Sequence, residues 1–300
     1  KENRNGVIKK KTMLDIGCGR GGDILKMYHS KISEYIGIDP DHSGLFGALD
    51  SATVRYQKNI KIFPDFTKAT FIQADGSTKF EAELQEKKLQ GMSLDNKKMI
   101  EKVFTNKKKF DIINSQFAIH YLFDSDDSVN NMVFNINKHL KIDGYFICTL
   151  FDTKQVLNLL AGKESYTSWY TDDDGQRTKF FEIIKKFEGE YNDKPGMPID
   201  VYMGWISEEG KYNTEYLVSP KLMIKTMEKS GCVLVDTDLF VNNYNINREW
   251  FTQVIDHEEN PKNKKVYKDV AEFYGNLKGE DKESKTWMEL SRYYIFKKIQ

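Results

Sequence analysis

Short apolar runs separated by amphipathic stretches dominate the first half of the chain. The runs predict strands at residues 13–16, 34–39, 71–75, 110–115 and 145–151. Phe110, Ile112 and Ile113 in the run at 110–115 favour a parallel strand covered on both faces. Helical spacing of apolar residues predicts helices at 22–30, 42–56 and 129–140, and an exposed helix with a loop at 91–96 within 79–106.

Strands and helices that alternate at this spacing predict an α/β fold with a doubly wound, mostly parallel sheet of seven strands. The rhythm changes after the fifth strand, where residues 152–200 predict an inserted hairpin or flap that begins with a helix at 154–161. We expect a single domain with an N-terminal arm at 1–12, because no repeat or low-complexity linker interrupts the sequence.

The last third of the chain returns to strand and helix patterns. Strands are predicted at 201–206, 214–218, 233–240 and 293–298. We expect the last of them to lie antiparallel at the end of the sheet. A helix is predicted at 219–230, with Ser219 as its N-cap, Pro220 at its first position and Gly231 after its end.

A glycine-rich turn follows the first predicted strand. Gly17, Gly19 and Gly22 have the G-x-G-x-x-G spacing of a tight turn that lets a ligand approach the backbone. Asp39 ends the second predicted strand about twenty residues later, where nucleoside-binding βαβ units hold a ribose hydroxyl. The turn and Asp39 together predict a nucleoside-binding unit, with a purely structural glycine turn as the alternative.

Two further acids favour S-adenosylmethionine over a nicotinamide dinucleotide. Asp15 lies two residues before Gly17, where it would repel a pyrophosphate but attract the cationic methionine end of a sulfonium cofactor. Asp75 ends the third predicted strand and can accept a hydrogen bond from the adenine amine or a neighbouring backbone position. Each acid alone could instead cap a turn, because Asp is common after strands.

Composition adds several exclusions. With 39% hydrophobic and 13% aromatic residues, the 300-residue chain can bury a substantial core. Its formal net charge is zero, so a generic polyanion-binding surface is not indicated, and any contact with nucleic acid should be local. We expect neither a membrane span, which needs about 20 apolar residues, nor a signal peptide. The chain begins with Lys1, and we expect it to be part of a longer polypeptide.

Cysteine and histidine usage points away from disulfides and metals. Cys18, Cys148 and Cys232 are widely spaced and odd in number, so we expect reduced core thiols in an intracellular protein. The five histidines lack metal-ligand spacing, and we expect no zinc site.

Residues 115–121, Ser-Gln-Phe-Ala-Ile-His-Tyr, follow the fourth predicted strand and place an aromatic ring, an imidazole and a phenol where open α/β sheets bind ligands. This segment resembles the mRNA cap guanine-N7 methyltransferases. So do, in order and at fitting spacing, the glycine turn at 14–26, the strand at 35–39, Arg55-Tyr56 and Glu-Tyr-Leu-Val at 215–218. The resemblance covers about residues 13–240, and Gln-Phe-x-x-His-Tyr and Glu-Tyr-Leu-Val are its specific parts.

The resemblance implies a class I S-adenosylmethionine-dependent methyltransferase fold and methyl transfer to N7 of the cap guanine. Because N7 has a lone pair and no proton, in-line attack needs no general base, and no catalytic side chain need touch the methyl group. Glu215 matches the acid that accepts hydrogen bonds from guanine N1–H and the N2 amine. The other implied substrate contacts are Phe117, His120, Tyr121 and Tyr202 around the base and Lys26 and Arg55 at the cap phosphates.

The implied cofactor contacts are Asp15, Gly17, Gly19, Asp39, Asp75 and Gln116. The family's upstream Asn and Lys segment is not recognisable in 1–12, and Lys11 or a neighbour is expected to replace it. Phe151 stands where the family usually has proline in the guanine pocket, and the aromatic residue that closes this pocket matches Tyr293 or Tyr294.

Structural readings of these residues stay open. Phe117, His120 and Tyr121 could belong to the core, and Glu215 could be a solvated acid on an edge strand. Lys26 and Arg55 could be surface charges of helices. Residues 141–144, Lys-Ile-Asp-Gly, match the K-x-D-G nucleophile motif of guanylyltransferases, but the pattern is short and falls in a predicted turn between helix and strand.

The resemblance implies 5′-capped RNA as the substrate and looks strongest to the large viral capping enzymes. It allows for triphosphatase and guanylyltransferase modules in the same polypeptide and for an activating subunit, and it implies no membrane. We expect a cytoplasmic location, at replication sites if the source is viral, or a nuclear one if the enzyme is cellular. The alternatives are a methyltransferase for another base or a small molecule, and a catalytically silent module that binds caps or a partner.

Overall fold

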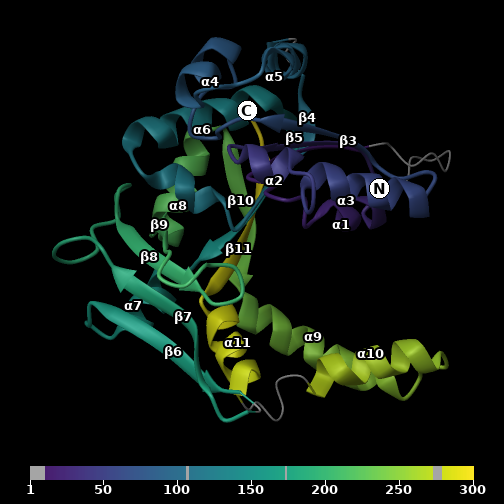
Figure 1. Ribbon diagram of the computed structural model, residues 1–300, viewed down its shortest axis with the longest axis vertical. Helices are drawn as coiled ribbons and strands as arrows, with labels where there is room; N and C mark the ends of the chain where they lie inside the picture. Colours follow the sequence, from purple (N-terminus) through teal and green to yellow (C-terminus); the bar gives the residue numbers. More distant parts are fainter. Residues whose placement is uncertain (1–10, 106–107, 173, 273–278) are drawn as a thin grey trace. The chain divides into compact units, whose positions relative to one another are not determined.

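The computed structural model describes residues 11–105, 108–172, 174–272 and 279–300. The predicted arm therefore lies outside the described residues, apart from 11 and 12. Contacts within the chain group it into two compact units (Figure 1). Unit 1 comprises the described residues of 1–150, 221–236 and 294–300, and unit 2 those of 151–220 and 237–293. Unit 2 contains the predicted insertion at 152–200 and extends beyond it. The expectation of a single domain stays a prediction.

Unit 1 is built on a seven-stranded sheet with the order β10-β11-β5-β4-β1-β2-β3 and helices on both faces (Figure 1). The strand bounds are β1 Lys11–Ile16, β2 Ile32–Asp39, β3 Lys68–Gln73, β4 Phe110–Gln116, β5 Leu140–Phe151, β10 Cys232–Leu239 and β11 Ser291–Lys298. β1 pairs in parallel with β2 and β4, β2 with β3, and β4 with β5. The prediction of a doubly wound, mostly parallel sheet is confirmed.

The helices of unit 1 follow the strands as predicted in order, with differences in extent. Their bounds are α1 Ile24–His29, α2 His42–Phe46, α3 Ala52–Ile62, α4 Ala82–Lys88, α5 Leu94–Ile100, α6 Asp126–His139 and α8 Pro220–Lys229. A π-helical turn, η1, spans Glu101–Thr105, and a 3-10 helix, η2, spans Ile119–Phe123.

The single helix predicted at 42–56 is wrong, because the chain breaks it into α2 and α3. Gly47 ends α2 in a conformation where an added Cβ would lie 2.5 Å from the Ser43 carbonyl oxygen. Ser51 then begins α3 as its N-cap, with Oγ accepting from the Val54 N–H. A glycine and a capping serine four residues apart therefore override the continuous helical spacing.

The helical region at 79–106 is also less exposed than predicted. Phe80, Ile100 and Phe104 are buried, and the rings of Phe80 and Phe104 are 4.5 Å apart. The amide side chain of Asn96 bonds to both backbone groups of Gln73, which attaches α5 to the end of β3. These helices consequently form part of the core on one side of the sheet.

The last strand is not at the end of the sheet, which corrects the prediction. β11 lies between β5 and β10, and β10 is the edge strand. Tyr294 and Phe296 are fully buried and stack with ring centroids 5.9 Å apart. An interior position suits this apolar run. The predicted turn at 141–144 also lies within β5, where Asp143 has a φ of 61°.

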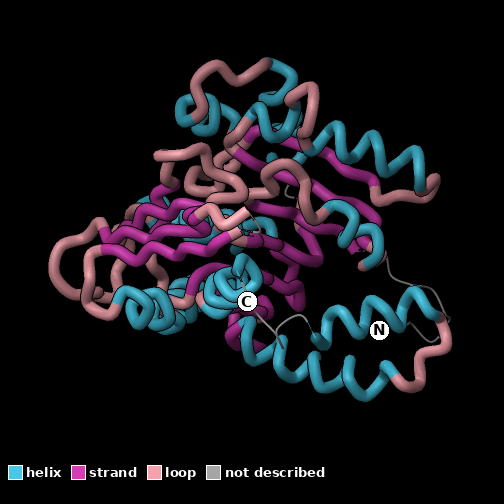
Figure 2. Tube along the Cα trace, turned by 60° about the horizontal axis from the view of Figure 1, so that its bottom comes forward, coloured by secondary structure: helices cyan, strands magenta, loops and turns pink. Residues whose placement is uncertain are grey.

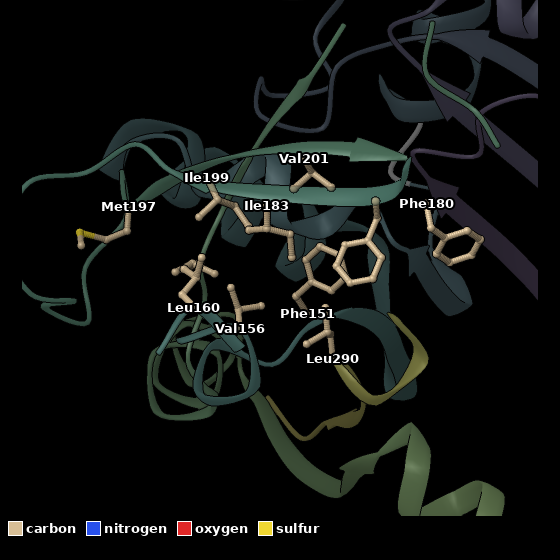
Figure 3. Close-up of a cluster of buried hydrophobic side chains, with 11 residues drawn as sticks. Phe151, Val156, Leu160, Phe180, Ile183, Met197, Ile199, Val201 and Leu290 are labelled. Atoms are coloured by element: carbon tan, nitrogen blue, oxygen red, sulfur yellow. The ribbon is translucent and has the colours of Figure 1, made fainter. Parts of the chain in front are cut away.

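Unit 2 contains an antiparallel four-stranded sheet in the order β6-β7-β8-β9. Its strands are β6 Ser165–Thr171, β7 Arg177–Lys185, β8 Pro198–Met203 and β9 Asn213–Tyr216. The hairpin predicted after the fifth strand is confirmed as β6 and β7. One face of this sheet packs on α7 (Thr153–Leu160) through a cluster that includes Ile183, Ile199, Val201, Val156 and Leu160 (Figure 3).

Three further helices belong to unit 2: α9 Phe240–Ile255, α10 Pro261–Glu272 and α11 Gly279–Glu289. α9 and α10 lie side by side (Figure 2), and the Phe251 and Tyr267 rings contact with centroids 5.4 Å apart. Trp287 of α11 packs against Phe181 of β7 at 5.1 Å. Sequence patterns predicted none of these three helices, and none of the residues of α9 is buried.

Candidate functional site

A cavity of about 320 Å³ opens in unit 1 at the carboxyl ends of β1, β2 and β3. Gly17, Asp39 and Asp75 line one part of it, and Phe117 and Tyr121 line another. The carboxyl edge of a parallel sheet is the expected ligand position in such folds. The cavity therefore brings together predicted cofactor contacts and predicted substrate contacts.

The turn after β1 requires its first glycine. Gly17 has a φ of 77°, and a Cβ added there would lie 2.3 Å from the Cβ of Ala118. No side chain fits at this distance, so the turn and the segment after β4 are close only because Gly17 has none. Gly17 and Ala118 both line the cavity.

Asp39 ends β2 and holds the glycine turn. Its Oδ2 accepts from the Gly19 N–H at 2.8 Å, and its Oδ1 accepts from the Asp41 N–H at 2.9 Å. Burial raises the pKa of Asp39, while these two N–H groups favour the ionised form. The carboxylate lines the cavity and keeps acceptor capacity for a ribose hydroxyl.

Asp75 follows β3 and is fixed by its own loop. Its Oδ1 accepts from the Ser77 N–H at 2.7 Å, and Lys88 of α4 places Nζ 3.7 Å from Oδ2. Lys88 also lines the cavity. Sequence reasoning missed Lys88, because it is one of many lysines in a charged helix and carries no motif.

Asp15 is buried behind the turn and does not line the cavity. Its side chain is 3% exposed, its Oδ2 accepts from the Tyr35 hydroxyl at 2.6 Å, and its Oδ1 accepts from Asn114 Nδ2 at 2.8 Å. Burial raises the pKa of Asp15 to about 6, and the two hydrogen bonds oppose this rise. Both carboxylate oxygens are thus engaged by protein groups that the sequence did not single out.

Gln116 and Lys11 occupy opposite ends of their strands. Gln116 ends β4, and its Nε2 donates to Asn114 Oδ1 at 2.7 Å. Lys11 begins β1, at the end remote from Ile16 and the cavity, and its carbonyl accepts from Ser33 Oγ at 3.0 Å. The structure does not bring Lys11 to the cofactor cavity.

The segment after β4 presents two aromatic rings. Phe117 has a φ of 50°, and its N–H donates to both the carbonyl and Oγ1 of Thr149 at 3.0 Å. A left-handed conformation is rare for a bulky residue and marks a site where the fold holds the backbone. Phe117 is 46% exposed and Tyr121 39% exposed, so the reading of both as core aromatics is wrong.

His120 differs from its neighbours because it is 4% exposed. Its ring lies 4.3 Å from the Tyr121 ring, measured between centroids. Burial lowers the pKa of His120 to about 3, so the imidazole is neutral at physiological pH. It can therefore orient its neighbours or donate and accept hydrogen bonds, but it is a weak base.

The two cations predicted for the cap phosphates lie on helices in local ion pairs. Lys26 Nζ is 2.6 Å from Asp23 Oδ1, and Arg55 pairs with both carboxylate oxygens of Asp50 at 2.8 and 2.9 Å. Neither lines the cavity. These contacts agree with the alternative that Lys26 and Arg55 are surface charges of helices. Their role in phosphate binding stays a prediction.

Glu215 and Tyr202 belong to unit 2 and point to opposite faces of its sheet. Glu215 of β9 pairs with Ile199 of β8, and both share the face that carries the apolar cluster with Val201. Tyr202 follows Val201 and therefore faces the other side, where its ring lies 5.8 Å from Tyr212. Glu215 is 5% exposed, so the reading of a solvated edge-strand acid is wrong.

Two further predicted substrate residues, Phe151 and Tyr293, also lie in unit 2. Phe151 is buried in the apolar cluster (Figure 3). Its ring lies edge-on to that of Trp287, with centroids 4.9 Å apart. Tyr293 is partly exposed, whereas Tyr294 is fully buried in unit 1. Burial thus leaves Tyr293 as the accessible aromatic of the pair.

No group of three or more His, Cys, Asp and Glu side chains among the described residues is placed to hold a metal ion. None of the described helices has the length and apolar composition of a membrane span. Cys18, Cys148 and Cys232 are buried and unpaired. Lys141 of the K-x-D-G pattern pairs with Asp111 at 2.9 Å, near the start of β4 and away from the cavity edge.

Comparison with known proteins identifies relatives. Residues 1–298 match the model of the mRNA (guanine-N(7))-methyltransferase domain. The chain is 39% identical over 297 residues to a "Probable mRNA-capping enzyme" of Acanthamoeba polyphaga mimivirus, a match that covers 95% of this chain and 25% of that protein. It is 30% identical over 143 residues to the mRNA cap guanine-N(7) methyltransferase of Candida albicans, covering 46% of this chain and 28% of that protein.

Among solved structures, an S-adenosylmethionine-dependent methyltransferase from Clostridium acetobutylicum matches with a TM-score of 0.47 and 15% identity, covering 96% of this chain and 83% of that one. The chain spans about a quarter of the length of the two curated relatives named above.

Proposed function

Because the chain belongs to the mRNA (guanine-N7)-methyltransferase family, we propose that it transfers a methyl group from S-adenosylmethionine to N7 of a 5′ cap guanine. One observation carries this proposal beyond the family match. Gly17, Asp39 and Asp75, expected to contact the cofactor, line the same cavity as Phe117 and Tyr121, expected to contact the base. A methyl donor and its acceptor must meet in one place.

The residues around the cavity fit this cofactor. Asp39 offers an acceptor for ribose hydroxyls beside a glycine turn that admits a ligand close to the backbone. Asp75 offers a second acceptor, which we assign to the adenine amine, and no cation other than Lys88 lines the described cavity. S-adenosylmethionine supplies a methyl group activated by its positively charged sulfur.

Methylation of guanine N7 does not require acid or base catalysis by a side chain. In the proposed reaction the lone pair of guanine N7 forms a bond to the methyl carbon, and the carbon–sulfur bond breaks with its electron pair staying on sulfur. No proton moves, so no general base is needed, and a neutral His120 with a pKa of about 3 agrees with a positioning role. Phe117 and Tyr121 would orient the base through their exposed rings.

Recognition of guanine is assigned to Glu215. A carboxylate can accept hydrogen bonds from guanine N1–H and the N2 amine, which adenine cannot offer in the same pattern. Burial makes such a charge-assisted pair selective, because the wrong base would leave the carboxylate without partners from the ligand. We further propose that the chain acts within a longer capping polypeptide, which its coverage of the mimivirus relative supports.

The proposal is tested by incubation with labelled S-adenosylmethionine and either GpppA or ApppA. We expect methyl gain on GpppA and none on ApppA, with the label at guanine N7 by mass spectrometry. Equal gain on both dinucleotides would contradict cap specificity and favour another acceptor. Binding of S-adenosylmethionine with no gain on GpppA would favour the catalytically silent module.

A further inference from the structure

Four polar side chains form a continuous line of hydrogen bonds across three neighbouring strands of unit 1. The Tyr35 hydroxyl of β2 and Asn114 Nδ2 of β4 both donate to the Asp15 carboxylate of β1, at 2.6 and 2.8 Å. Gln116 Nε2 then donates to Asn114 Oδ1 at 2.7 Å. Tyr35, Asp15 and Asn114 are at most 4% exposed, so this line is shielded from water up to its last member.

The backbone is shaped to allow the line. Asp15 lies opposite Gly37 on one side and Asn114 on the other. A Cβ added at Gly37 would lie 2.9 Å from Cε1 of Tyr35 and 2.8 Å from Sγ of Cys18. Gly37 therefore leaves the space through which the Tyr35 ring reaches Asp15.

The direction of these hydrogen bonds is fixed because the Asp15 carboxylate can only accept them. An ionised carboxylate has no donor, so Asn114 must turn its NH₂ toward Asp15 and its carbonyl toward Gln116. That carbonyl in turn takes the NH₂ of Gln116. The side-chain carbonyl oxygen of Gln116 ends this series, and no other described residue donates a hydrogen bond to it.

Gln116 ends β4 immediately before Phe117, which lines the cavity. A ligand group that meets the Gln116 carbonyl must be a hydrogen-bond donor. The α-ammonium group of the cofactor's methionine end is such a donor, whereas its carboxylate is not.

We propose that Asn114 is a positioning residue that relays the acceptor character of buried Asp15 to Gln116, so that Gln116 presents its carbonyl oxygen to the cofactor's ammonium group. This inference rests on the proposed function, since it assumes S-adenosylmethionine in the cavity. It reassigns Asp15 from a direct contact to the anchor of the relay. Tyr35 keeps the anchor in place by engaging its second oxygen.

The proposal is tested by calorimetric titration with two ligands that share the adenosine part. S-adenosylhomocysteine carries the ammonium group, and 5′-methylthioadenosine lacks the whole amino acid end. In Asn114→Leu we expect affinity for S-adenosylhomocysteine to fall about tenfold or more, and affinity for 5′-methylthioadenosine to change less than twofold. An equal loss for both ligands would show that Asn114 is only structural and would overturn the proposal.

A rescue experiment separates the relay from other causes. Glutamate at position 116 is an acceptor in either orientation, so Gln116→Glu in the Asn114→Leu background should restore most of the S-adenosylhomocysteine affinity. Failure of this rescue in a folded double variant would overturn the relay. If Asn114→Leu does not fold, Asn114→Ala, which removes the same amide group, is used in the same pair of measurements with the same expectations.

Two controls complete the design. Thr67→Val removes another buried hydrogen bond of unit 1, from Thr67 Oγ1 to the Ile32 carbonyl at 2.8 Å, and should lower stability without changing either affinity. Unaltered protein that binds neither ligand would contradict the proposed function itself. Binding of both ligands with no preferential effect of Asn114→Leu would contradict only the relay.

Discussion

The backbone N–H of Gly19 donates to Asp39 Oδ2 at 2.8 Å, which joins the glycine turn after β1 to the acid that ends β2. The same carboxylate also accepts from the Asp41 N–H at 2.9 Å. Asp39 thus shapes the turn and offers an acceptor to the cavity at once. A change at this residue should therefore affect every ligand that carries the ribose.

Asp39→Ala should weaken S-adenosylhomocysteine and 5′-methylthioadenosine by similar factors of about tenfold or more, because both contain the ribose that the carboxylate would hold. Calorimetric titration of both ligands measures this. Asp41→Ala, which removes the N-cap of α2 but no cavity-lining group, is the matched control and should leave both affinities within about threefold. A loss confined to S-adenosylhomocysteine would contradict the ribose assignment.

Gly17→Ala should destabilise unit 1 more than Gly91→Ala does, because only the new methyl group at position 17 meets another residue. Gly17 and Gly91 both have positive φ, but only the Cβ at 17 meets Ala118, at 2.3 Å, while the space at Gly91 is open. We expect Gly91→Ala to cost about 1–2 kcal/mol and Gly17→Ala to cost about 1–3 kcal/mol more, from overpacking. Urea unfolding measures both free energies.

The clash at Gly17 can be relieved from the other side. Ala118→Gly removes the Cβ that a side chain at 17 would meet. The double variant Gly17→Ala with Ala118→Gly should therefore recover part of the free energy of unfolding. Additive losses in the double variant would show that contact with Ala118 is not the reason for glycine at 17.

Glu215→Gln should lower kcat/KM for GpppA about ten- to hundredfold, because a charge-assisted hydrogen bond contributes about 1.5–3 kcal/mol. Affinity for S-adenosylhomocysteine should not change. Asp200→Asn is the matched control, since Asp200 lies on the opposite face of the same sheet and accepts from Thr214 Oγ1 at 2.7 Å. Parallel losses of turnover and cofactor affinity in Glu215→Gln would mean that Glu215 is structural.

Acid stability should depend on His139, which is fully buried and has Nδ1 3.0 Å from the Lys108 carbonyl oxygen. Burial lowers the pKa of His139 to about 4. The unfolded chain takes up a proton near pH 6.5 and the folded chain does not, so stability present above pH 6.5 is lost as pH falls toward 4. This residue accounts for a loss of up to about 3 kcal/mol.

His139→Phe should flatten that pH dependence, because the ring contact with Phe104 is kept and the titrating group is removed. Urea unfolding at pH 7 and pH 4.5 gives the two free energies. His257→Phe, at an exposed histidine, should leave the difference between the two pH values unchanged. An unaltered difference in His139→Phe would show that other groups govern acid unfolding.

The order of elements, the glycine turn and its acid were readable from the sequence because their signals are local. Strand runs, the spacing of Gly17 and Gly19, and Asp39 at a strand end depend on neighbours along the chain. The break between α2 and α3 could also have been predicted, because its causes are local. Gly47 ends α2 and Ser51 caps α3, and the groups they contact lie within a few residues along the chain. Family resemblance then added Phe117 and Tyr121, which the structure brings to the cavity.

Only the tertiary structure decided which way the remaining polar groups turn. Asp15 bonds to residues 20 and 99 positions away, so no pattern around it could show that its carboxylate serves Tyr35 and Asn114 rather than a ligand. The opposite faces of Glu215 and Tyr202 follow from strand register, which is set by pairing across the sheet. The sequence determined which chemical groups the protein has near its cofactor turn, and packing between distant segments determined which of them are left to face a ligand.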